Sequence, residues 1–296
     1  MPGTQQDQQA LPALDIGVFS TDPTCYDQPP RSGARHLTNI IVARVKGYRP
    51  LMMDLHLPAS PPGGGPVPLI AWIHGGSFWE GSRTGLPDTL HPIGFQEHLL
   101  ARGYAVADID YRLSREAVFP AQLHDVQAAI GWLRTFAEPL GLDPRRFAGW
   151  GESAGATLAA LAGLDRSHDL AALQAVVDWY GPIDVTAPGM GGSDEPGGWL
   201  LGGSPAQKPA LAEAAEAASP IRQVHAAAPP FVLVHGTADD AVPYQGSRTL
   251  ADALHGYGVR AELIPVDGAG HMFAGASDIL GLIHRSLDFL DVALKK

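Results

Sequence analysis

Short apolar runs alternate with longer segments of helical spacing along most of this chain. The runs, most of them bounded by Gly, Pro or Asp, predict strands over Leu69–Ile73, Ala105–Asp110, Phe147–Trp150, Ala175–Trp179, Phe231–Val234 and Ala261–Val266. Short apolar runs with turn residues at their ends are typical of parallel strands that are buried on both faces.

Three further segments predict helices. Residues 154–164 are mostly Ala, Leu and Gly, which suits a helix buried on most sides. Two other segments space their apolar residues by three or four, as amphipathic helices do. These are residues 120–136, with Leu123, Val126, Ile130 and Leu133, and the C-terminal stretch, with Leu280, Ile283, Leu287, Leu290 and Leu294. Strands alternating with helices predict an α/β fold with a mostly parallel central sheet covered by helices on both faces.

The ends of the pattern set the expected domain organisation. Residues 1–35 are predicted to be a loose N-terminal arm, and residues 36–296 a single α/β domain. A strand pair is expected at the start of that domain, over Leu37–Val45 and Leu51–Leu57, where Met-Asp-Leu-His-Leu alternates apolar and polar positions. The turn-rich segment Pro58–Pro66 follows it.

One region interrupts the alternation of strands and helices. Residues 186–220 are too long for a simple connection, and Trp199, Leu200 and Leu201 are the apolar part of this segment. Excursions of this length over a sheet often act as lids or binding loops. We therefore predict a lid-like insertion at about 186–220.

Composition and charge exclude several classes of protein. The 296 residues are 45% hydrophobic and 17% charged, as expected of a compact globular protein with a large core. The formal net charge is −11, and no Lys/Arg run is longer than a pair. Nucleic acids and anionic membrane surfaces are therefore unsuitable partners on electrostatic grounds.

The sequence also carries expectations about location and assembly. Cys25 is the single cysteine, so no intrachain disulfide can form. The first residues have neither the basic nor the apolar region of a secretory signal. No run approaches the roughly 18 apolar residues of a membrane span. We predict a cytoplasmic protein without a membrane span, and a homo-oligomer is possible.

The segment Gly-Trp-Gly-Glu-Ser-Ala-Gly at 149–155 crowds small residues around Ser153. Ser153 follows a predicted strand and precedes a predicted helix. In a strand–turn–helix elbow the serine side chain points out of the sheet, and Gly151 and Gly155 must be small because strand and helix approach closely there. The Gly-x-Ser-x-Gly pattern alone is common, but its position between a strand and a helix favours a nucleophile at Ser153.

A nucleophilic serine needs a base and an acid that orients the base. His271 lies in a loop of small residues between the last strand and the last helix, and Asp239 follows the Phe231–Val234 strand. The chain order Ser, Asp, His is the order of α/β-hydrolases. Asp240 is adjacent, but Asp239 is favoured because it comes first after the His-Gly-Thr-Ala turn.

A candidate oxyanion hole follows the Leu69–Ile73 strand. In His-Gly-Gly-Ser-Phe at 74–78 two glycines let the backbone turn its N–H groups into the site. We expect the amides of Gly76, Ser77 and Ala154 to bind the oxyanion. The helix N-terminus behind Ser153 adds partial positive charge there.

Four motifs together resemble those of the α/β-hydrolase superfamily. They are His-Gly-Gly-Ser-Phe (74–78), Gly-Glu-Ser-Ala-Gly (151–155), His-Gly-Thr-Ala-Asp-Asp-Ala-Val-Pro (235–243) and Gly-Ala-Gly-His-Met-Phe (268–273). More closely, they resemble the hormone-sensitive-lipase-like esterases and the related feruloyl and acetylxylan esterase-like group. The resemblance covers about residues 68–275, and Asp-Tyr-Arg-Leu (110–113), Asp-Pro-Arg-Arg (143–146) and Asp-Trp-Tyr-Gly-Pro-Ile-Asp (178–184) are similar to connecting stretches of that group. It implies a serine esterase that needs no cofactor. Ser77 stands where the lipase-like type usually has a third glycine, and the N-terminal arm is shorter than its usual cap.

Several further residues have both a functional and a structural interpretation. Phe78 and Trp199 are candidates for a substrate pocket, with Trp79 less favoured, although ordinary packing explains them equally well. Glu152 either touches the substrate or braces the site. Four polar residues are expected to hold structure rather than catalyse, namely His74 and His235 at strand ends, Asp178 and Asp184. No metal-ligand spacing is present, so no metal is expected.

The sequence thus predicts a carboxylic ester hydrolase that acts through Ser153, His271 and Asp239 on a small-molecule ester, with short acyl or small aromatic groups. Three alternatives stay open. They are a feruloyl or acetyl carbohydrate esterase, an arylformamidase-like or peptidase-like amide hydrolase, and a non-catalytic binding protein on the same fold. The fold hosts many reactions and does not decide between them.

Overall fold

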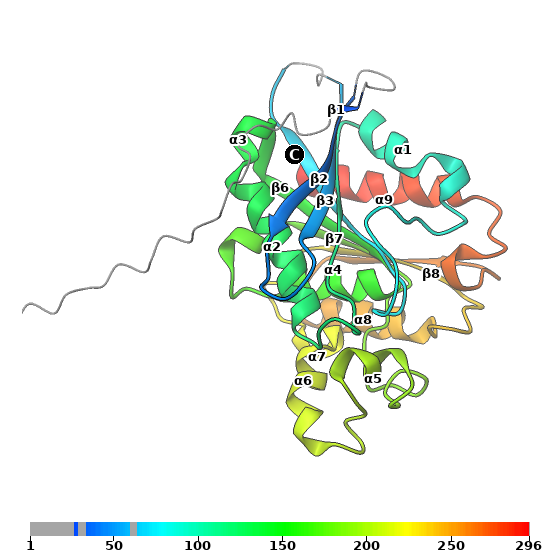
Figure 1. Ribbon diagram of the computed structural model, residues 1–296. Helices are drawn as coiled ribbons and strands as arrows, with labels where there is room; N and C mark the ends of the chain where they lie inside the picture. The colour runs from blue at the N-terminus through cyan, green and yellow to red at the C-terminus, as the bar shows by residue number, and fades with distance from the viewer. Residues whose placement is uncertain (1–26, 29–33, 60–63, 296) are drawn as a thin grey trace, which may run out of the picture.

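One central sheet organises the molecule in the computed structural model, which describes residues 27–28, 34–59 and 64–295 (Figure 1). Over these ranges the sheet has nine strands in the order β1-β2-β3-β5-β4-β6-β7-β8-β9. Their bounds are β1 Asp27–Gln28, β2 Arg35–Ala43, β3 Leu51–Leu57, β4 Val67–Ile73, β5 Ala105–Ile109, β6 Leu142–Glu152, β7 Ala175–Trp179, β8 Phe231–Gly236 and β9 Ala261–Val266.

The strand pairing confirms the predicted, mostly parallel sheet. Strands β1, β2, β3 and β5 pair antiparallel with their neighbours in that series. The pairs from β5 through β4, β6, β7 and β8 to β9 are all parallel. All seven residues of β4 are buried, because helices cover both faces of the parallel part. The carboxyl ends of these strands therefore lie at one edge of the sheet.

Helices cover the two faces of this sheet. Their bounds are α1 Phe95–Ala101, α2 Ala121–Thr135, α3 Ala137–Leu140, α4 Ala154–Leu164, α8 Gln245–Gly256 and α9 Ile279–Leu294. Helices α1 and α9 pack on one face around Trp72, Trp150 and Trp179. Helices α2, α4 and α8 pack on the other face (Figure 1). The predicted helices over 120–136, 154–164 and the C-terminal stretch are confirmed.

The observed bounds differ from the predictions in a few places. Strand β6 begins at Leu142, not at Phe147, because Val67 pairs with Leu142 and the charged pair Arg145-Arg146 lies within the strand. Helices α1 and α8 were not predicted. In α8 the buried Leu250 and Leu254 are four residues apart, which is a helical signal.

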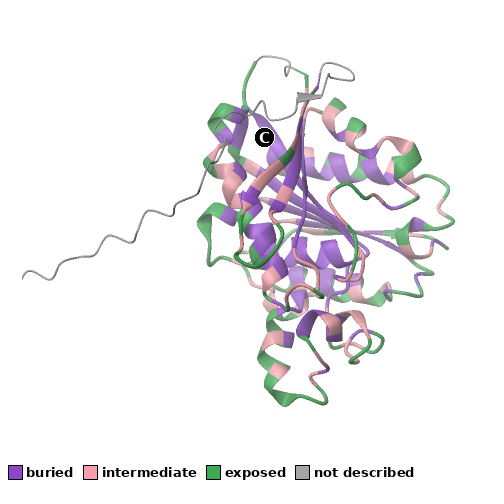
Figure 2. Cartoon of the chain, viewed as in Figure 1, coloured by how far each residue is buried: buried purple, intermediate pink, exposed green. Residues whose placement is uncertain are grey.

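The segment 186–220 forms short helices rather than an irregular loop. These are α5 Pro196–Leu201, the 3-10 turn η4 Pro209–Leu211 and α6 Ala212–Ala217, with α7 Pro220–Gln223 at its end. Leu200 and Leu201 are buried in the same core cluster as α2 and α4, whereas α6 exposes much of its surface (Figure 2). Phe119 N–H donates to the carbonyl of Leu200 at 2.8 Å, which ties α5 to the segment before α2. Its action as a lid stays a prediction.

Most of the predicted N-terminal arm, including Cys25, lies outside the described residues. Within its range, Asp27–Gln28 forms β1, and Arg35 already belongs to β2. Among the helices of the described ranges, none has the length and apolar character that crossing a membrane requires.

Candidate active site

Ser153 occupies a sharp elbow between β6 and α4. Its backbone has φ +50° and ψ −122°, a strained combination for a residue with a side chain. A Cβ at Gly151 would overlap the carbonyl of Gly155, and a Cβ at Gly155 would overlap the carbonyls of Ile73 and His74. The predicted need for glycine on both sides of Ser153 is thus confirmed, because strand, turn and helix meet in backbone contact.

The structure brings the three predicted triad residues into one hydrogen-bonded chain. His271 Nε2 lies 3.1 Å from Ser153 Oγ, and His271 Nδ1 lies 2.7 Å from Asp239 Oδ2. His271 starts the 3-10 turn η5 (His271–Phe273) after β9, and Asp239 follows β8. The neighbouring Asp240 is exposed, whereas the Asp239 side chain is fully buried, so the choice between the two carboxylates agrees with the geometry.

Asp239 is held by more partners than His271 alone. Its Oδ1 accepts the amides of Ala241 at 3.0 Å and Val242 at 2.8 Å, and His235 Nε2 lies 3.3 Å from Oδ2. Burial by itself raises the pKa of Asp239, but hydrogen bonds from His235 and His271 outweigh it and hold that pKa well below its ordinary value. The carboxylate is therefore ionised whenever His271 has to carry a positive charge.

Two of the three amides predicted to bind an oxyanion, those of Gly76 and Ser77, lie in the loop after β4, and the third, that of Ala154, lies at the start of α4. Gly76 has φ +102° and Ser77 has φ +56°, so the chain turns sharply there. Among the hydrogen bonds of the described residues, none uses the N–H of Gly76, Ser77 or Ala154. Unpaired amides beside a nucleophile are the feature that an oxyanion hole requires. Their role is a proposal, developed below.

Glu152, next to the nucleophile, points at the same loop. Its Oε1 accepts the amide of Gly75 at 2.6 Å, and the carboxylate occupies the space that a Cβ at Gly75 would need. Burial raises the pKa of Glu152 to about 7, against the opposing effects of the Gly75 amide and His271. Of the two interpretations of Glu152, this contact supports the brace.

The three aromatic candidates for a pocket differ in exposure. Phe78 is completely buried in the core cluster and offers no surface to a substrate in this structure, so of its two interpretations the structure supports ordinary packing. Trp79 and Trp199 are partly exposed, and their ring centroids lie 5.0 Å apart. The guanidinium of Arg115 lies 5.0 Å from the Trp79 ring centroid. Trp79, the less favoured residue, is thus better placed than Phe78.

Two tyrosines near the site were not singled out from the sequence. The Tyr180 ring meets the His271 imidazole edge-on at 5.0 Å between centroids, and Tyr111 contacts the loop after β4. Both lie in stretches quoted for their resemblance alone, Asp-Trp-Tyr-Gly-Pro and Asp-Tyr-Arg-Leu. His235 is fully buried between Asp239, Val242 and Ser247, in agreement with its predicted structural role.

The sheet order, the strained serine between β6 and α4 and the chain order of the triad define an α/β-hydrolase. Within that class, the BD-FAE family model matches residues 53–254, and the protein belongs to the BD-FAE family.

Several known proteins to which the chain is similar are described as esterases. The chain is 30% identical over 243 residues to the esterase LipQ of Mycobacterium tuberculosis, covering 74% of this chain and 56% of LipQ. It is 29% identical over 235 residues to LipC of the same organism, covering 70% of this chain and 53% of LipC. The chain thus spans about half the length of these curated relatives.

Two solved structures resemble the whole fold. A truncated carbohydrate esterase from gut microbiota aligns with a TM-score of 0.73 and 25% identity over 92% of this chain and 100% of that one. The thermophilic esterase Est2 of Thermogutta terrifontis aligns with a TM-score of 0.69 and 25% identity over 89% of this chain and 94% of that one.

Proposed function

We propose that the protein hydrolyses carboxylic esters, with Ser153 as the nucleophile, His271 as the base and Asp239 as the acid that orients the base. The observation that carries this proposal is the continuous chain from Ser153 Oγ through His271 to Asp239, with contacts of 3.1 Å and 2.7 Å. Two further observations support it: Ser153 forms a strained elbow at the start of α4, and the amides of Gly76, Ser77 and Ala154 have no acceptor among the described residues.

The proposed reaction has two halves. Ser153 Oγ attacks the ester carbonyl while His271 Nε2 takes its proton, and the amides of Gly76, Ser77 and Ala154 bind the oxyanion. The intermediate collapses, His271 protonates the departing alcohol, and an acyl group remains on Ser153. A water then attacks the acyl group as its proton passes to His271, and His271 gives that proton to Ser153 Oγ as the carboxylic acid leaves. The buried carboxylate of Asp239 stabilises the positive His271 in both halves.

Esters with short acyl or small aromatic groups are the proposed substrates. In support, the partly exposed rings of Trp79 and Trp199 lie 5.0 Å apart, and Trp79 follows the loop after β4 closely in the chain. Catalysis by the triad needs no cofactor. A cytoplasmic location and formation of a homo-oligomer stay predictions of the sequence.

A rate comparison tests the proposal. Hydrolysis of p-nitrophenyl acetate, butyrate, octanoate and palmitate is measured for the wild type, Ser153→Ala and the control Ser167→Ala, an exposed serine hydrogen-bonded to Asp165. We expect activity on the short esters that falls by about 10⁴-fold or more in Ser153→Ala. The control should keep the wild-type rate. An inactive wild type, or an undiminished rate in Ser153→Ala, would contradict the mechanism.

A feruloyl or acetyl carbohydrate ester is the second candidate substrate. The partly exposed Trp79 and Trp199 offer aromatic faces, which stack on planar or sugar rings, and the structural neighbour described as a carbohydrate esterase supports the same class. Methyl ferulate and acetylated xylo-oligosaccharides test it. Trp199→Ala should then slow these substrates much more than p-nitrophenyl acetate. Turnover of anilides alone would favour an amide hydrolase, and ligand binding without turnover a non-catalytic protein.

A further inference from the structure

Tyr111 is fully buried, and its hydroxyl contacts the loop that precedes the proposed oxyanion amides. The single hydroxyl proton is shared between the carbonyl of His74, at 3.0 Å, and the carbonyl of Gly75, at 3.2 Å. Its ring stacks on the His74 imidazole, with centroids 4.3 Å apart and 12° between the planes. Tyr111 thus reaches two consecutive peptide units without being part of the triad.

The direction of each proposed oxyanion amide follows from the carbonyl of the same peptide unit. In a trans peptide the C=O group and the next residue's N–H point in opposite directions. The carbonyl of Gly75 shares its unit with the N–H of Gly76. Tyr111 and His74 Nδ1, at 2.7 Å, both hold that carbonyl. The Gly76 N–H, at the other side of the same peptide unit, therefore points away from Tyr111 and His74.

The neighbouring peptide units are held in the same way. The carbonyl of His74 accepts the Tyr111 hydroxyl, and the N–H of that unit, on Gly75, donates to Glu152 at 2.6 Å. The carbonyl of Gly76 accepts the amides of Trp79 at 2.9 Å and Glu80 at 3.0 Å, which fixes the N–H of Ser77. Side chains therefore fix the Gly76 amide, whereas the backbone fixes the Ser77 amide.

The imidazole of His74 has a defined role in this arrangement. A carbonyl oxygen only accepts, so His74 Nδ1 carries the proton in its contact with Gly75. Burial lowers the pKa of His74 to about 4, so at neutral pH the ring is uncharged and keeps that single N–H. We call Tyr111, His74 and Glu152 the loop clamp.

The loop needs such a clamp because of its glycines. Glycine populates positive and negative φ almost equally, so two in succession allow many orientations of the peptide between them. The glycines cannot be replaced, since the Glu152 carboxylate fills the Cβ position at Gly75 and the carbonyl of Glu80 fills that at Gly76. Hydrogen bonds to the carbonyls must therefore supply the order that side chains on the loop would otherwise give.

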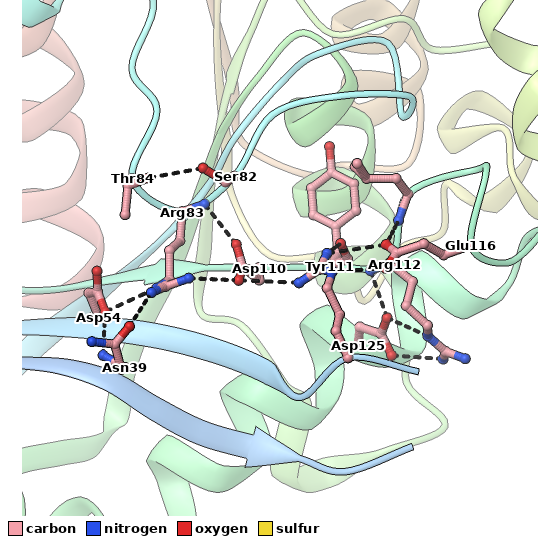
Figure 3. A network of polar contacts seen from close by, with 12 residues as sticks. Asn39, Asp54, Ser82, Arg83, Thr84, Asp110, Tyr111, Arg112, Glu116 and Asp125 are labelled. Carbon is pink, nitrogen blue, oxygen red and sulfur yellow. Dashed lines mark hydrogen bonds and ion pairs between the residues drawn. The ribbon is translucent and has the colours of Figure 1, made fainter. Parts of the chain in front are cut away.

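Ion pairs hold the backbone of Tyr111 on both sides (Figure 3). Before it, Asp110 accepts from the backbone N and from Nη1 of Arg83, each at 2.9 Å. After it, the Arg112 guanidinium grips both oxygens of Asp125 at 2.8 Å. Arg49 Nη2 donates to the Tyr111 carbonyl at 3.0 Å. With its backbone fixed at three points, Tyr111 presents its hydroxyl at a defined place.

We propose that Tyr111, with Glu152 opposite it, is a positioning residue of the proposed esterase, whose hydroxyl aims the Gly76 amide at the oxyanion without touching the substrate. Donation to the Gly75 carbonyl also polarises that peptide unit and makes its N–H a stronger donor. The proposal rests on the proposed function, because it concerns the oxyanion of ester hydrolysis.

The test compares Tyr111→Phe with Tyr104→Phe. Tyr104 is a matched control: its ring is also fully buried, and its hydroxyl donates to Asp291 at 2.8 Å on the opposite face of the sheet. We expect kcat for p-nitrophenyl butyrate to fall in Tyr111→Phe by about 10- to 100-fold, because small misplacements of catalytic groups cause losses of this size. KM should change little, and Tyr104→Phe should keep the wild-type kcat. Equal kcat in the two variants overturns the proposal.

A transition-state analogue separates positioning from general loosening. When Ser153 Oγ adds to a trifluoromethyl ketone, its proton passes to His271 and the ketone oxygen becomes an oxyanion. Affinity for this ketone should fall in Tyr111→Phe by the same factor as kcat. Affinity for the corresponding alcohol, which forms no oxyanion, should not. Equal losses for both ligands would overturn the proposal.

Two further outcomes are also decisive. If Tyr111→Phe is not recovered folded, Glu152→Ala tests the clamp from its other end, and an unchanged kcat there overturns the proposal. A wild type that is inactive, or a Ser153→Ala variant that is active, would refute the proposed function itself. An active wild type whose kcat is unaffected by Tyr111→Phe would refute only the clamp.

Discussion

Replacing Glu152 with Gln should change the free energy of unfolding in a way that depends on pH. The difference between the variant and the wild type should be more favourable to the variant at alkaline pH than at acidic pH. Glu152 is 6% exposed, and this burial raises the pKa of its carboxyl group from 4.5 to about 7. Gln keeps an oxygen that can accept the Gly75 amide, but it never ionises. The other titratable groups that face this carboxyl are His271, Tyr180 and Tyr111.

The magnitude follows from linkage. Between pH 4.5 and about 7 the unfolded chain loses the Glu152 proton while the folded chain keeps it, so the wild-type free energy of unfolding falls as the pH rises. At about 1.4 kcal/mol per pH unit the full loss is about 3 kcal/mol, and about 2 kcal/mol of it falls between pH 5 and pH 8. The raised pKa thus costs stability at alkaline pH and nothing below pH 4.5.

Urea unfolding, followed by tryptophan fluorescence at pH 5, 6.5 and 8, measures this effect. The free energy of unfolding of Glu152→Gln minus that of the wild type should rise by about 2 kcal/mol from pH 5 to pH 8. Glu213→Gln, at an exposed position on α6, is the control and should show no pH-dependent difference. A difference for Glu152→Gln that is constant with pH would refute the assignment of a neutral, buried carboxyl.

Three other changes have defined outcomes. Asp239→Asn should lower kcat by about 10⁴-fold, because His271 loses its oriented partner, whereas Asp240→Asn should not; equal kcat in both would reject the choice of acid. Gly155→Ala should lower Tm strongly through overlap with the carbonyl of Ile73, whereas Gly256→Ala, in open space, should keep or raise it. Arg83→Met should destabilise the protein by about 3 to 5 kcal/mol in chemical unfolding, since it strips the buried Asp54 and Asp110 of a partner; a loss below 1 kcal/mol would contradict this.

The sequence predicted those parts of the site that depend on local backbone chemistry. Gly151 and Gly155 are needed because strand and helix touch at Ser153, and that need can be deduced from the residues themselves. Helix α4 also has the predicted bounds, and all of its residues are buried, as its run of small and apolar residues indicated. Strand β6 was underestimated because the charged residues at its start hide the continuation of the ladder.

Contacts between distant segments could not be predicted in this way. Nothing in Asp-Tyr-Arg-Leu reveals that the Tyr111 hydroxyl reaches a loop 36 residues earlier in the chain. The sequence does not distinguish the two interpretations of Glu152. The 2.6 Å hydrogen bond from the Gly75 amide to Glu152 Oε1 does. Phe78 had a pocket and a packing interpretation, and the structure places it fully buried, with a positive φ of 60°. In each case the role of the residue depends on its surroundings in the folded chain, which the residue type alone does not reveal.

Covalent labelling tests the central claim most directly. The protein is treated with a fluorophosphonate, which reacts with activated serines, and the labelled peptide is identified by mass spectrometry for the wild type and His271→Ala. The account predicts one label per chain in the wild type, on Ser153, and almost none in His271→Ala, because the 3.1 Å contact from His271 Nε2 activates the hydroxyl. Labelling of another serine, or equal labelling of Ser153 in both proteins, would contradict it.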